Sequence, residues 1–401
     1  MPPAEAADQA NQQLVDLMIA EGALWSPALI AAFRATPRHR FLDRVWQFHP
    51  RANHWKETIT REPGPTELKL VYADRALITH LGSEKPGGKE TPISSSSQPT
   101  LMAQMLEDLQ LRTGLNVLEI GAGTGYNAAL MAHVVGPDRV ISIDVDRNVL
   151  SEAWDHLRAF PERRVTLQHG DGRQGCPEAA PFDRIMATAA TPVIEPAWLA
   201  QLAEGGMLSA PLALAPGLAF VICGTQSAGV FRGRLKRAAY FMSLRAEHET
   251  GDDGSEAENA TRGLQTMPAP WAEVFHRRRT RGSWLRFAQS LALYGFLRGL
   301  TLSYRAPTED LPHYGISNAE GHRCWFGAEE WQVSSGDGRN LGWQLWRDFL
   351  DAGAPWPTEY EIRIGNQRGL PLCHATSFIR HEAAGEQIWE LVEPRVRGNW
   401  L

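Results

Sequence analysis

The stretch Val117-Leu118-Glu119-Ile120-Gly121-Ala122-Gly123-Thr124-Gly125 decides the fold. A short apolar run leads directly into a turn with three glycines, and apolar residues at helical spacing follow from Tyr126 to Val135. Glycines let the backbone turn sharply and approach a ligand without an intervening Cβ. Open α/β sheets bind their ligands at such strand ends. The sequence therefore predicts a ligand-binding turn at the carboxyl end of a buried strand.

Strand and helix patterns alternate downstream of this turn. Strands are predicted at Val140–Val145, Val165–His169, Arg184–Thr188 and Met207–Ala210, and helices at Asn148–Phe160 and Trp198–Leu202. Such alternation implies parallel strands joined by right-handed crossovers, so the predicted fold is a doubly wound, Rossmann-like α/β sheet. Leu218–Thr225 and Ala238–Leu244 are predicted as an antiparallel pair at its edge.

The segments before the sheet are predicted to be helical and then irregular. Apolar residues recur at helical spacing over Gln12–Phe41, with Ser26-Pro27 marking the start of a second helix. Residues 48–66 are rich in His, Pro and polar side chains, and residues 82–100 are rich in Gly, Lys, Ser and Pro. Both of these segments are predicted to be loops.

The composition changes after Arg245, which indicates a domain boundary. Residues 247–263 are acidic, polar and nearly free of large apolar side chains, as expected of an exposed linker. Residues 264–401 hold most of the tryptophans. We therefore predict a cofactor-binding domain over residues 1–246 and a smaller C-terminal α+β domain over residues 264–401, in which substrate is recognised.

Composition and charge exclude several classes of protein. The net charge of the 401 residues is -6, which argues against broad nucleic-acid binding because phosphate neutralisation needs a surplus of Lys and Arg. The four cysteines lie far apart without a C-x-x-C pair, so no zinc site or disulfide framework is expected. The acidic N-terminal stretch and the interrupted apolar runs predict neither a signal peptide nor a membrane span. We expect a cytoplasmic protein without metal; its oligomeric state is not indicated.

The spacing of the glycines distinguishes between cofactors. A dinucleotide fingerprint needs Gly or Ala where this chain has Tyr126. Glu119 with the three following glycines instead resembles the E-x-G-x-G-x-G motif of class I methyltransferases, which bind S-adenosyl-L-methionine. Asp144, at the end of the next strand, is placed to accept hydrogen bonds from the ribose, and Asp171 is placed at the adenine edge. The predicted cofactor-binding residues are Glu119, Gly121, Gly123, Thr124, Gly125, Asp144, Val145, Asp171 and Gly172.

Short motifs spread from Phe33 to Arg245 carry a family resemblance. They are Thr36–Leu42, Tyr72-Ala73-Asp74, Ser97-Gln98-Pro99, Val117–Gly125 with Tyr126, Gly170-Asp171-Gly172, Ala180–Ile185, Thr188-Ala189-Ala190 and Gly205-Gly206. With this set the chain resembles the protein-L-isoaspartate O-methyltransferase family. The resemblance implies methyl transfer to a side-chain carboxylate of a peptide or protein.

The chain departs from the family pattern at two places. Ser95-Ser96-Ser97 stands where the family has Thr-Ile-Ser, after the inserted-looking segment Gly82–Glu90, and the chain continues well past the usual family end. Both features resemble the branch found with lanthipeptides and graspetides, which methylates an aspartate of a cyclised ribosomal precursor peptide and leads to succinimide or isoaspartate. We therefore expect a cyclised precursor peptide as substrate. The alternative is repair of L-isoaspartyl residues in damaged proteins.

The predicted chemistry needs positioning and no strong base. A carboxylate is ionised at neutral pH, so the enzyme has to dehydrate it and align it with the sulfonium methyl group. The predicted catalytic residues are Ser97, with Ser95 and Ser96, which would hold the carboxylate, and Thr188, which would line the same site. A serine run is by itself typical of a polar loop, but the flanking Gln98-Pro99 and the family resemblance favour a functional role here.

Two other functions remain open at this point. A nucleic-acid base methyltransferase usually carries an Asn/Asp-Pro-Pro-aromatic motif after the fourth strand, where this chain reads Ala187-Thr188-Ala189-Ala190-Thr191-Pro192. A binding protein that uses the fold only to recognise a peptide is a further alternative, against which the intact glycine turn argues.

Overall fold

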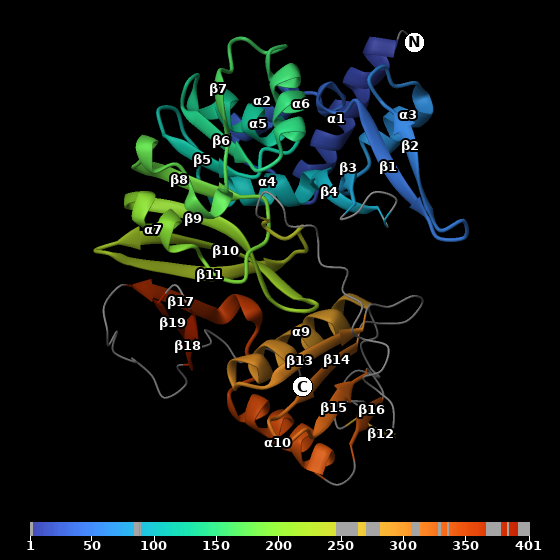
Figure 1. Ribbon diagram of the computed structural model, residues 1–401, viewed down its shortest axis with the longest axis vertical. Coiled ribbons are helices and arrows are strands. Elements are labelled where there is room, and N and C mark those ends of the chain that lie inside the picture. Colours follow the sequence, from blue (N-terminus) through green and yellow to red (C-terminus); the bar gives the residue numbers. More distant parts are fainter. Residues whose placement is uncertain are drawn as a thin grey trace. The chain divides into compact units, whose positions relative to one another are not determined.

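The computed structural model describes residues 3–83, 88, 90–245, 264–269, 281–305, 313–327, 330–334, 337–365, 378–382 and 385–391. The chain forms two compact units (Figure 1). The first unit comprises Met1–Pro211 and Phe241–Asp252, and the second comprises Leu212–Tyr240 and Asp253–Leu401. The predicted linker over residues 247–263 lies outside the described residues.

The first unit is built on a parallel sheet. Its strands are β5 (Val117–Ile120), β6 (Val140–Asp144), β7 (Val165–His169), β8 (Phe182–Ala187) and the beginning of β9 (Leu202–Ala215), in the order β9-β8-β5-β6-β7. The connecting helices are α5 (Tyr126–Val135), α6 (Arg147–Leu157) and α7 (Pro196–Gln201). Since the strand order reverses between β5 and β8, the carboxyl end of β5 is the topological switch point at which such sheets bind ligands. The predicted doubly wound α/β sheet is confirmed.

Burial explains why these segments adopt their structures. All four residues of β5 are buried, and α5 is buried along almost its whole length, as expected of a strand and helix at the centre of a two-sided sheet. Helix α6 begins where the Asp146 carboxylate accepts from the backbone N–H groups of Asn148 and Val149, at 2.8 and 3.2 Å. The strand before the glycine turn and the helix after it are therefore both buried in the core.

The N-terminal part of the first unit contains helices and a small antiparallel sheet. The elements are α1 (Pro3–Ala20), α2 (Pro27–Ala35), β1 (Arg44–His49), β2 (His54–Ile59), α3 (Pro65–Val71), β3 (Leu77–Gly82), β4 (Thr91–Ser96) and α4 (Pro99–Asp108). The four strands follow the order β2-β1-β3-β4. The two N-terminal helices were predicted. The prediction of loops over residues 48–66 and 82–100 is wrong, because β1, β2 and β4 are largely exposed or half-buried and so lack a continuous apolar run.

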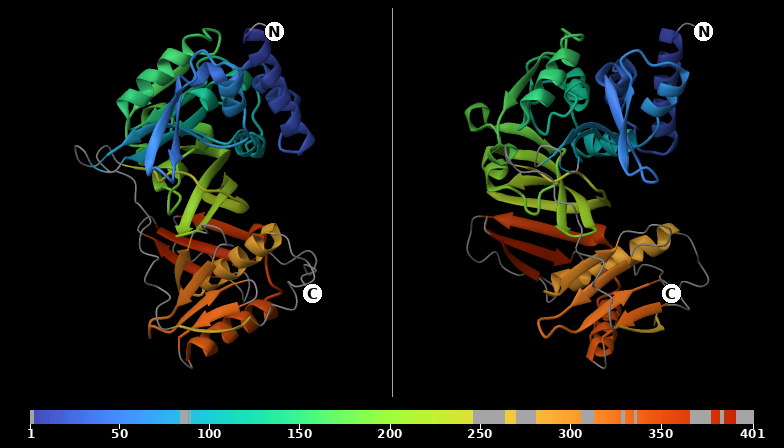
Figure 2. Two further views of the ribbon diagram at one scale, coloured as in Figure 1. Left: turned by 90° about the vertical axis from the view of Figure 1, so that its right-hand side faces the viewer. Right: turned by 45° about the vertical axis from the view of Figure 1, so that its right-hand side comes forward.

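The described residues of the second unit form antiparallel strands and include the helices α9 (Arg281–Leu297) and α10 (Asp337–Asp351) (Figures 1 and 2). One set of hydrogen-bonded strands, part of the ten-stranded sheet that also includes β9, contains β10 (Leu218–Ser227), β11 (Val230–Ala238), β17 (Tyr360–Gly365), β19 (Gly385–Leu391) and β18 (Phe378–Glu382), in the order β18-β19-β17-β11-β10. The other contains β12 (Gln265–Pro268), β16 (Glu330–Val333), β15 (Arg323–Phe326), β14 (His313–Ser317) and β13 (Thr301–Arg305). Helices α9 and α10 pack on this five-stranded sheet.

The strand predicted at Ala238–Leu244 is wrong in its position. β10 forms a hairpin with β11, because Ala228 and Gly229, with φ of 52° and 73°, reverse the chain directly after β10. Charged residues alternate with buried ones along β11, and this masks its strand character in the sequence. Since β17 pairs with β11, these strands group with the C-terminal elements, whereas the predicted boundary at residue 246 places them with the first domain.

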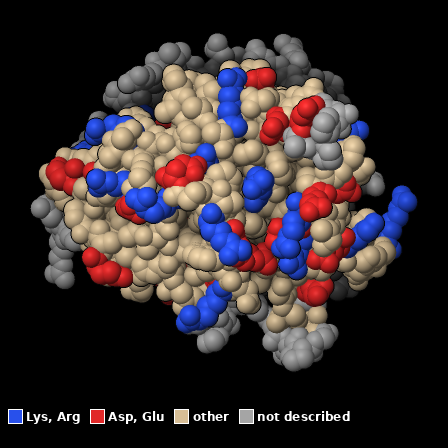
Figure 3. Space-filling model, turned by 90° about the horizontal axis from the view of Figure 1, so that it is seen from above, with Lys and Arg blue, Asp and Glu red and all other residues tan. Residues whose placement is uncertain are grey.

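The charges on the surface and the helix compositions bear on possible partners. On the face shown in Figure 3, basic and acidic side chains of the described residues are interspersed and do not gather by sign. None of the helices in the described part of the chain combines the length and the apolar character needed to cross a bilayer. Within the same residues, His, Cys, Asp and Glu side chains form no group of three suited to a metal ion.

Candidate active site

The glycine turn after β5 requires glycine at three positions. Gly121, Gly123 and Gly125 have φ of 97°, 51° and 80°, in the left-handed region that other residues rarely adopt. The turn is tied to β6, because the Ile143 carbonyl accepts from the N–H groups of Gly121 and Ala122 at 2.8 and 3.1 Å. The turn is therefore a fixed backbone surface at the end of the parallel sheet.

Thr188, at the carboxyl end of β8, contacts the main chain of this turn. Its hydroxyl lies 2.7 Å from the Gly121 carbonyl oxygen and 3.1 Å from that of Ile120, so the hydroxyl proton is shared by the turn. A Cβ at Gly121 would lie 2.6 Å from the Thr188 hydroxyl oxygen. The structure thus places the predicted catalytic Thr188 against the main chain of the glycine turn.

Asp144 ends β6 beside the turn. One of its carboxylate oxygens accepts from the Gly123 N–H at 3.1 Å, and the other accepts from the Asp146 N–H at the same distance. Burial raises the pKa of Asp144, against the effect of these hydrogen bonds. Each oxygen retains a lone pair, which suits a ribose diol. The carbonyl oxygen of the neighbouring Val145 lies 3.0 Å from the imidazole Nε2 of His169, and it accepts a hydrogen bond when that nitrogen is protonated.

Glu119 lies behind the turn, without exposed surface. Its carboxylate accepts from the Asn127 amide at 2.7 Å and from the Ser142 hydroxyl at 2.5 Å. Burial raises the pKa of Glu119 to about 7, although both hydrogen bonds oppose the rise. Glu119, predicted to bind the cofactor, thus links β5 to β6 and α5 through buried hydrogen bonds.

Thr124, Asp171 and Gly172 were also predicted to bind cofactor. The Thr124 carbonyl lies 2.9 Å from the His156 ring, and the Thr124 hydroxyl accepts from the Tyr126 N–H at 3.4 Å. Desolvation raises the pKa of Asp171, but the Arg173 guanidinium, which binds both carboxylate oxygens, lowers it overall. A Cβ at Gly172 would lie 2.5 Å from the Ile120 side chain, so the turn after β7 also requires glycine.

The predicted catalytic serines lie beside the glycine turn. They stand at and just after the end of β4, with Ser96 buried and Ser95 and Ser97 half-buried. A Cβ at Gly123 would lie 3.5 Å from the Ser95 carbonyl oxygen. The structure therefore brings together two segments that the sequence separates, the serine run and the glycine turn.

Arg38 holds the serine segment in place, and its role was missed from the sequence. The guanidinium is fully buried and donates at 2.9–3.3 Å to six oxygen atoms. These are the carbonyls of Val71, Ala73, Arg75, Ser96 and Ser97 and the hydroxyl of Ser96. In the sequence Arg38 stands out only as part of the motif Thr36–Leu42. Its contacts cannot be predicted, because main-chain carbonyls are present at every residue.

Asp74 fixes the next segment. Its carboxylate accepts from the Gln98 side-chain amide at 2.8 Å and from the Thr100 N–H at 2.9 Å, in the first turn of α4. The motifs around Arg38, Asp74 and Ser97 are thus one hydrogen-bonded assembly. Their contacts explain why three short stretches far apart in the sequence belong to one site.

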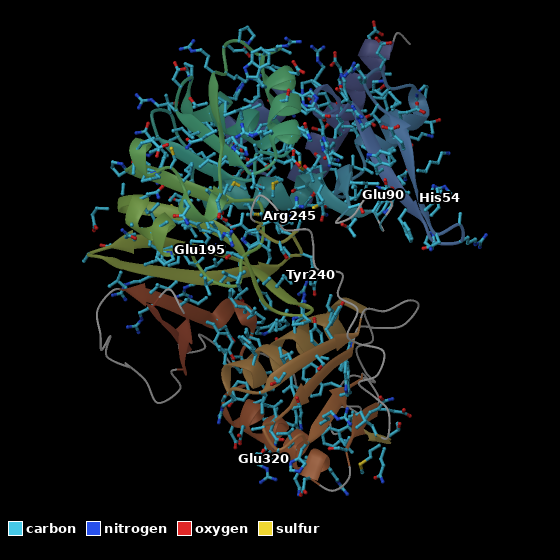
Figure 4. The ribbon with its side chains drawn as sticks, viewed as in Figure 1. His54, Glu90, Glu195, Tyr240, Arg245 and Glu320 are labelled. Carbon is cyan, nitrogen blue, oxygen red and sulfur yellow. The ribbon has the colours of Figure 1, made fainter. Side chains whose placement is uncertain are left out.

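A late segment of the chain completes the first unit at this site. The N–H of Ala190, after β8, donates to Met242 at 2.8 Å, and the Leu244 N–H donates to Ala190 at 2.7 Å. The Arg245 side chain, marked in Figure 4, donates to the Ile93 carbonyl of β4 at 2.6 Å. Residues 242–245 therefore link the end of β8 to the strand that carries the serines.

The reversed strand order, the glycine turn and the strand-end Asp144 together define a class I S-adenosylmethionine-dependent methyltransferase. A family model described as protein-L-isoaspartate(D-aspartate) O-methyltransferase matches residues 9–245. The chain belongs to this family, and it is an S-adenosylmethionine-dependent protein carboxyl O-methyltransferase.

Curated relatives share the first part of the chain. A protein-L-isoaspartate O-methyltransferase of Ignicoccus hospitalis is 32% identical over 212 residues, which cover 52% of this chain and 85% of the relative. One from an Anaeromyxobacter species is 46% identical over 194 residues, covering 48% and 75%. One from Thermotoga maritima is 38% identical over 148 residues, covering 37% of this chain and 44% of the relative.

A solved structure extends the likeness in fold. A protein-L-isoaspartate O-methyltransferase matches with a TM-score of 0.51 and 22% identity, and the match covers 88% of this chain and 96% of the other. The family model ends at residue 245, so a match of this extent also includes C-terminal elements. The likeness in fold to this structure therefore extends beyond the part of the chain that the family model matches.

Proposed function

We propose that this chain is a repair methyltransferase that transfers a methyl group to the free carboxylate of L-isoaspartyl residues in proteins or peptides. The observation that carries the proposal is the position of the Ser95 carbonyl beside Gly123 of the glycine turn, within a stretch that the family model matches. The names of the curated relatives support the same acceptor.

The residues present fit S-adenosylmethionine. Asp144 keeps acceptor capacity for the ribose hydroxyls, and the glycines leave open the space beside Ser95 that a side chain at 123 would occupy. When bound, the cofactor supplies an electrophilic methyl group on sulfur. Asp171 would approach the adenine together with its partner Arg173.

The chain's own residues then have to position an acceptor that is already ionised. The half-buried Ser97 hydroxyl makes no hydrogen bond within the described residues, and it would donate to the acceptor carboxylate. Water exclusion and alignment supply the rate enhancement, since no proton has to be removed from the acceptor. The methyl ester then reacts further without the enzyme: the following backbone nitrogen attacks the ester carbonyl, methanol leaves, and a succinimide forms.

The second candidate acceptor is an aspartate in a cyclised ribosomal peptide. It is favoured by the run Ser94–Ser97 and by the segment Gly82–Glu90, of which residues 84–87 and 89 lie outside the described residues. The C-terminal extension no longer favours it, because a structure named for the isoaspartate reaction matches 88% of the chain. A cytoplasmic location likewise stays a prediction from the sequence.

The full-length enzyme should be offered three peptides of one sequence: a linear isoaspartyl peptide, its linear aspartyl counterpart and a cyclised aspartyl peptide. Methyl ester and succinimide are followed by mass spectrometry with S-adenosylmethionine in excess. Repair predicts fast methylation of the isoaspartyl peptide alone. Methylation of the cyclised aspartyl peptide with none of the isoaspartyl peptide would overturn the proposal and restore the specialised function.

A further inference from the structure

Arg38 is a buried cation whose hydrogen-bond partners among the described residues include no carboxylate. Its guanidinium has no exposed surface, and it is surrounded by five main-chain carbonyls and one hydroxyl. Burial lowers the pKa of Arg38 to about 10. Burying a charge is unfavourable unless several good hydrogen bonds compensate for it. The positive charge of Arg38 therefore polarises the few peptide groups that accept hydrogen bonds from it.

Two of these peptide groups follow β4 directly. The Ser96 and Ser97 carbonyls accept from the same Arg38 nitrogen, Nη2, at 3.1 and 2.9 Å. Because a trans peptide is planar, its N–H points opposite to its carbonyl. The N–H groups of Ser97 and Gln98 therefore point away from Arg38. Neither N–H donates to any acceptor among the described residues.

The Ser97 N–H points to the same side of β4 as the Ser95 carbonyl. Successive carbonyls along a strand alternate in direction, so the Ser95 carbonyl is directed opposite to that of Ser96 and to the same side as the Ser97 N–H. The Ser95 carbonyl oxygen is the atom that lies 3.5 Å from a Cβ built on Gly123. The Ser97 N–H is thus directed to the side of β4 on which Gly123 of the glycine turn lies.

We propose that Arg38 is a positioning residue for methyl transfer: it holds the Ser96 and Ser97 carbonyls so that the N–H groups of Ser97 and Gln98 bind the acceptor carboxylate. The guanidinium also polarises both peptide groups, which makes their N–H groups stronger donors. The identity of the peptide that carries this carboxylate rests on the proposed function. The carboxylate site itself does not.

A purely structural Arg38 would affect folding alone, so the test needs a matched buried arginine. Arg163 is also buried, and it donates to the Thr36 hydroxyl at 2.6 Å and to the Ala35 carbonyl at 2.9 Å, away from the serine segment. Arg38→Met and Arg38→Lys are compared with Arg163→Met. Thermal unfolding and calorimetric cofactor affinity are measured for each full-length variant.

The first readout is independent of the natural substrate. Acetate is titrated into the wild-type protein, and the amide resonances of Ser97 and Gln98 are followed by NMR. Both should shift in the wild type and in Arg163→Met but not in Arg38→Met. Arg38→Lys should respond weakly, because an ammonium has three donors for six acceptors. If Arg38→Met does not fold, a full wild-type response in Arg38→Lys would overturn the proposal.

The second readout uses catalysis well below the unfolding temperature. Arg38→Met should lower kcat/KM for the isoaspartyl peptide by roughly 10- to 100-fold, as misplaced reacting groups do, with cofactor affinity unchanged. The carboxamide analogue is the same peptide with its acceptor carboxylate replaced by a carboxamide. The preference of Arg38→Met for binding the isoaspartyl peptide over this analogue, measured from inhibition constants, should disappear. Equal losses in Arg163→Met, or a preserved preference in Arg38→Met, would overturn the proposal. A wild-type enzyme inactive on isoaspartyl peptides would refute the repair function, while the acetate titration still decides the role of Arg38.

Discussion

The Thr188 hydroxyl occupies the space that a side chain at position 121 would need. It lies 2.7 Å from the Gly121 carbonyl oxygen and would lie 2.6 Å from a Cβ on the same residue. The end of β8 and the glycine turn are thus complementary in shape and in hydrogen bonding. Two substitutions separate these contributions.

Thr188→Val removes the hydroxyl and keeps the side-chain volume. The Gly121 carbonyl loses its partner, which is worth about 0.5–1.5 kcal/mol for an ordinary hydrogen bond. We expect S-adenosylmethionine to bind about 2- to 10-fold more weakly by calorimetry. If Thr188 instead acts only on the acceptor, cofactor affinity will stay at the wild-type value and kcat alone will fall.

Gly121→Ala tests the shape of the turn. The variant combines a strained φ of 97° with a methyl group placed against Thr188. The control is Gly114→Ala, whose φ is 89° and whose added methyl group meets nothing within 4 Å. Both variants should melt earlier than the wild type, but only Gly121→Ala should lose cofactor binding. Equal cofactor affinities in the two variants would contradict this assignment.

Asp144→Asn tests recognition of the ribose. Hydrogen bonds to a charged acceptor contribute about 1.5–3 kcal/mol, so cofactor affinity should fall at least about tenfold. Asp146→Asn is the matched control, because Asn caps α6 as well as Asp does. Calorimetry on both variants decides: a wild-type dissociation constant in Asp144→Asn would mean that another group holds the ribose.

Ser97→Ala tests the acceptor side of the site. Loss of the hydroxyl should slow methylation while leaving cofactor affinity unchanged, because the hydroxyl makes no bond to the glycine turn. Ser94→Ala, in a buried position of β4, serves as the control. Initial rates at saturating cofactor are the measurement. Equal rates for Ser97→Ala and the wild type would exclude the Ser97 hydroxyl from carboxylate binding.

Glu119→Gln tests the buried carboxyl beneath the turn. Because the pKa of Glu119 rises from its ordinary 4.5 to about 7 in the folded protein, the folded state holds a proton that the unfolded chain has released in this range. Wild-type stability is therefore lost as the pH rises from about 4.5 to about 7. The Gln variant does not ionise, and the unpartnered Asn127 Oδ1 can accept from its amide.

The two proteins should consequently agree in stability below pH 4.5 and diverge above pH 7, by up to roughly 3 kcal/mol in favour of Glu119→Gln. Urea unfolding at several pH values measures the difference, in which the other titrating groups cancel. A constant difference across this range would show that Glu119 keeps an ordinary pKa.

The sequence predicts the parallel sheet well because its strands are buried apolar runs and its turn demands glycines. The hairpin of β1 and β2 escapes prediction since its residues are mostly half-exposed and polar. Strand β11 escapes for a related reason, its alternating charges. The assembly around Arg38 is unreadable from the sequence, because five of its six acceptors are main-chain oxygens that any residue supplies.

The contact of Arg245 with Ile93 has a consequence for synthesis of the protein. The two residues are 152 positions apart, and the chain between them includes Leu212–Tyr240 of the second unit. On a ribosome, the N-terminal segments emerge first and begin to fold, yet the serine strand has to wait for its partner. Closing so long a loop slows folding more than it weakens the folded state. A nascent chain therefore gains a complete catalytic unit only after two strands of the second unit have been made.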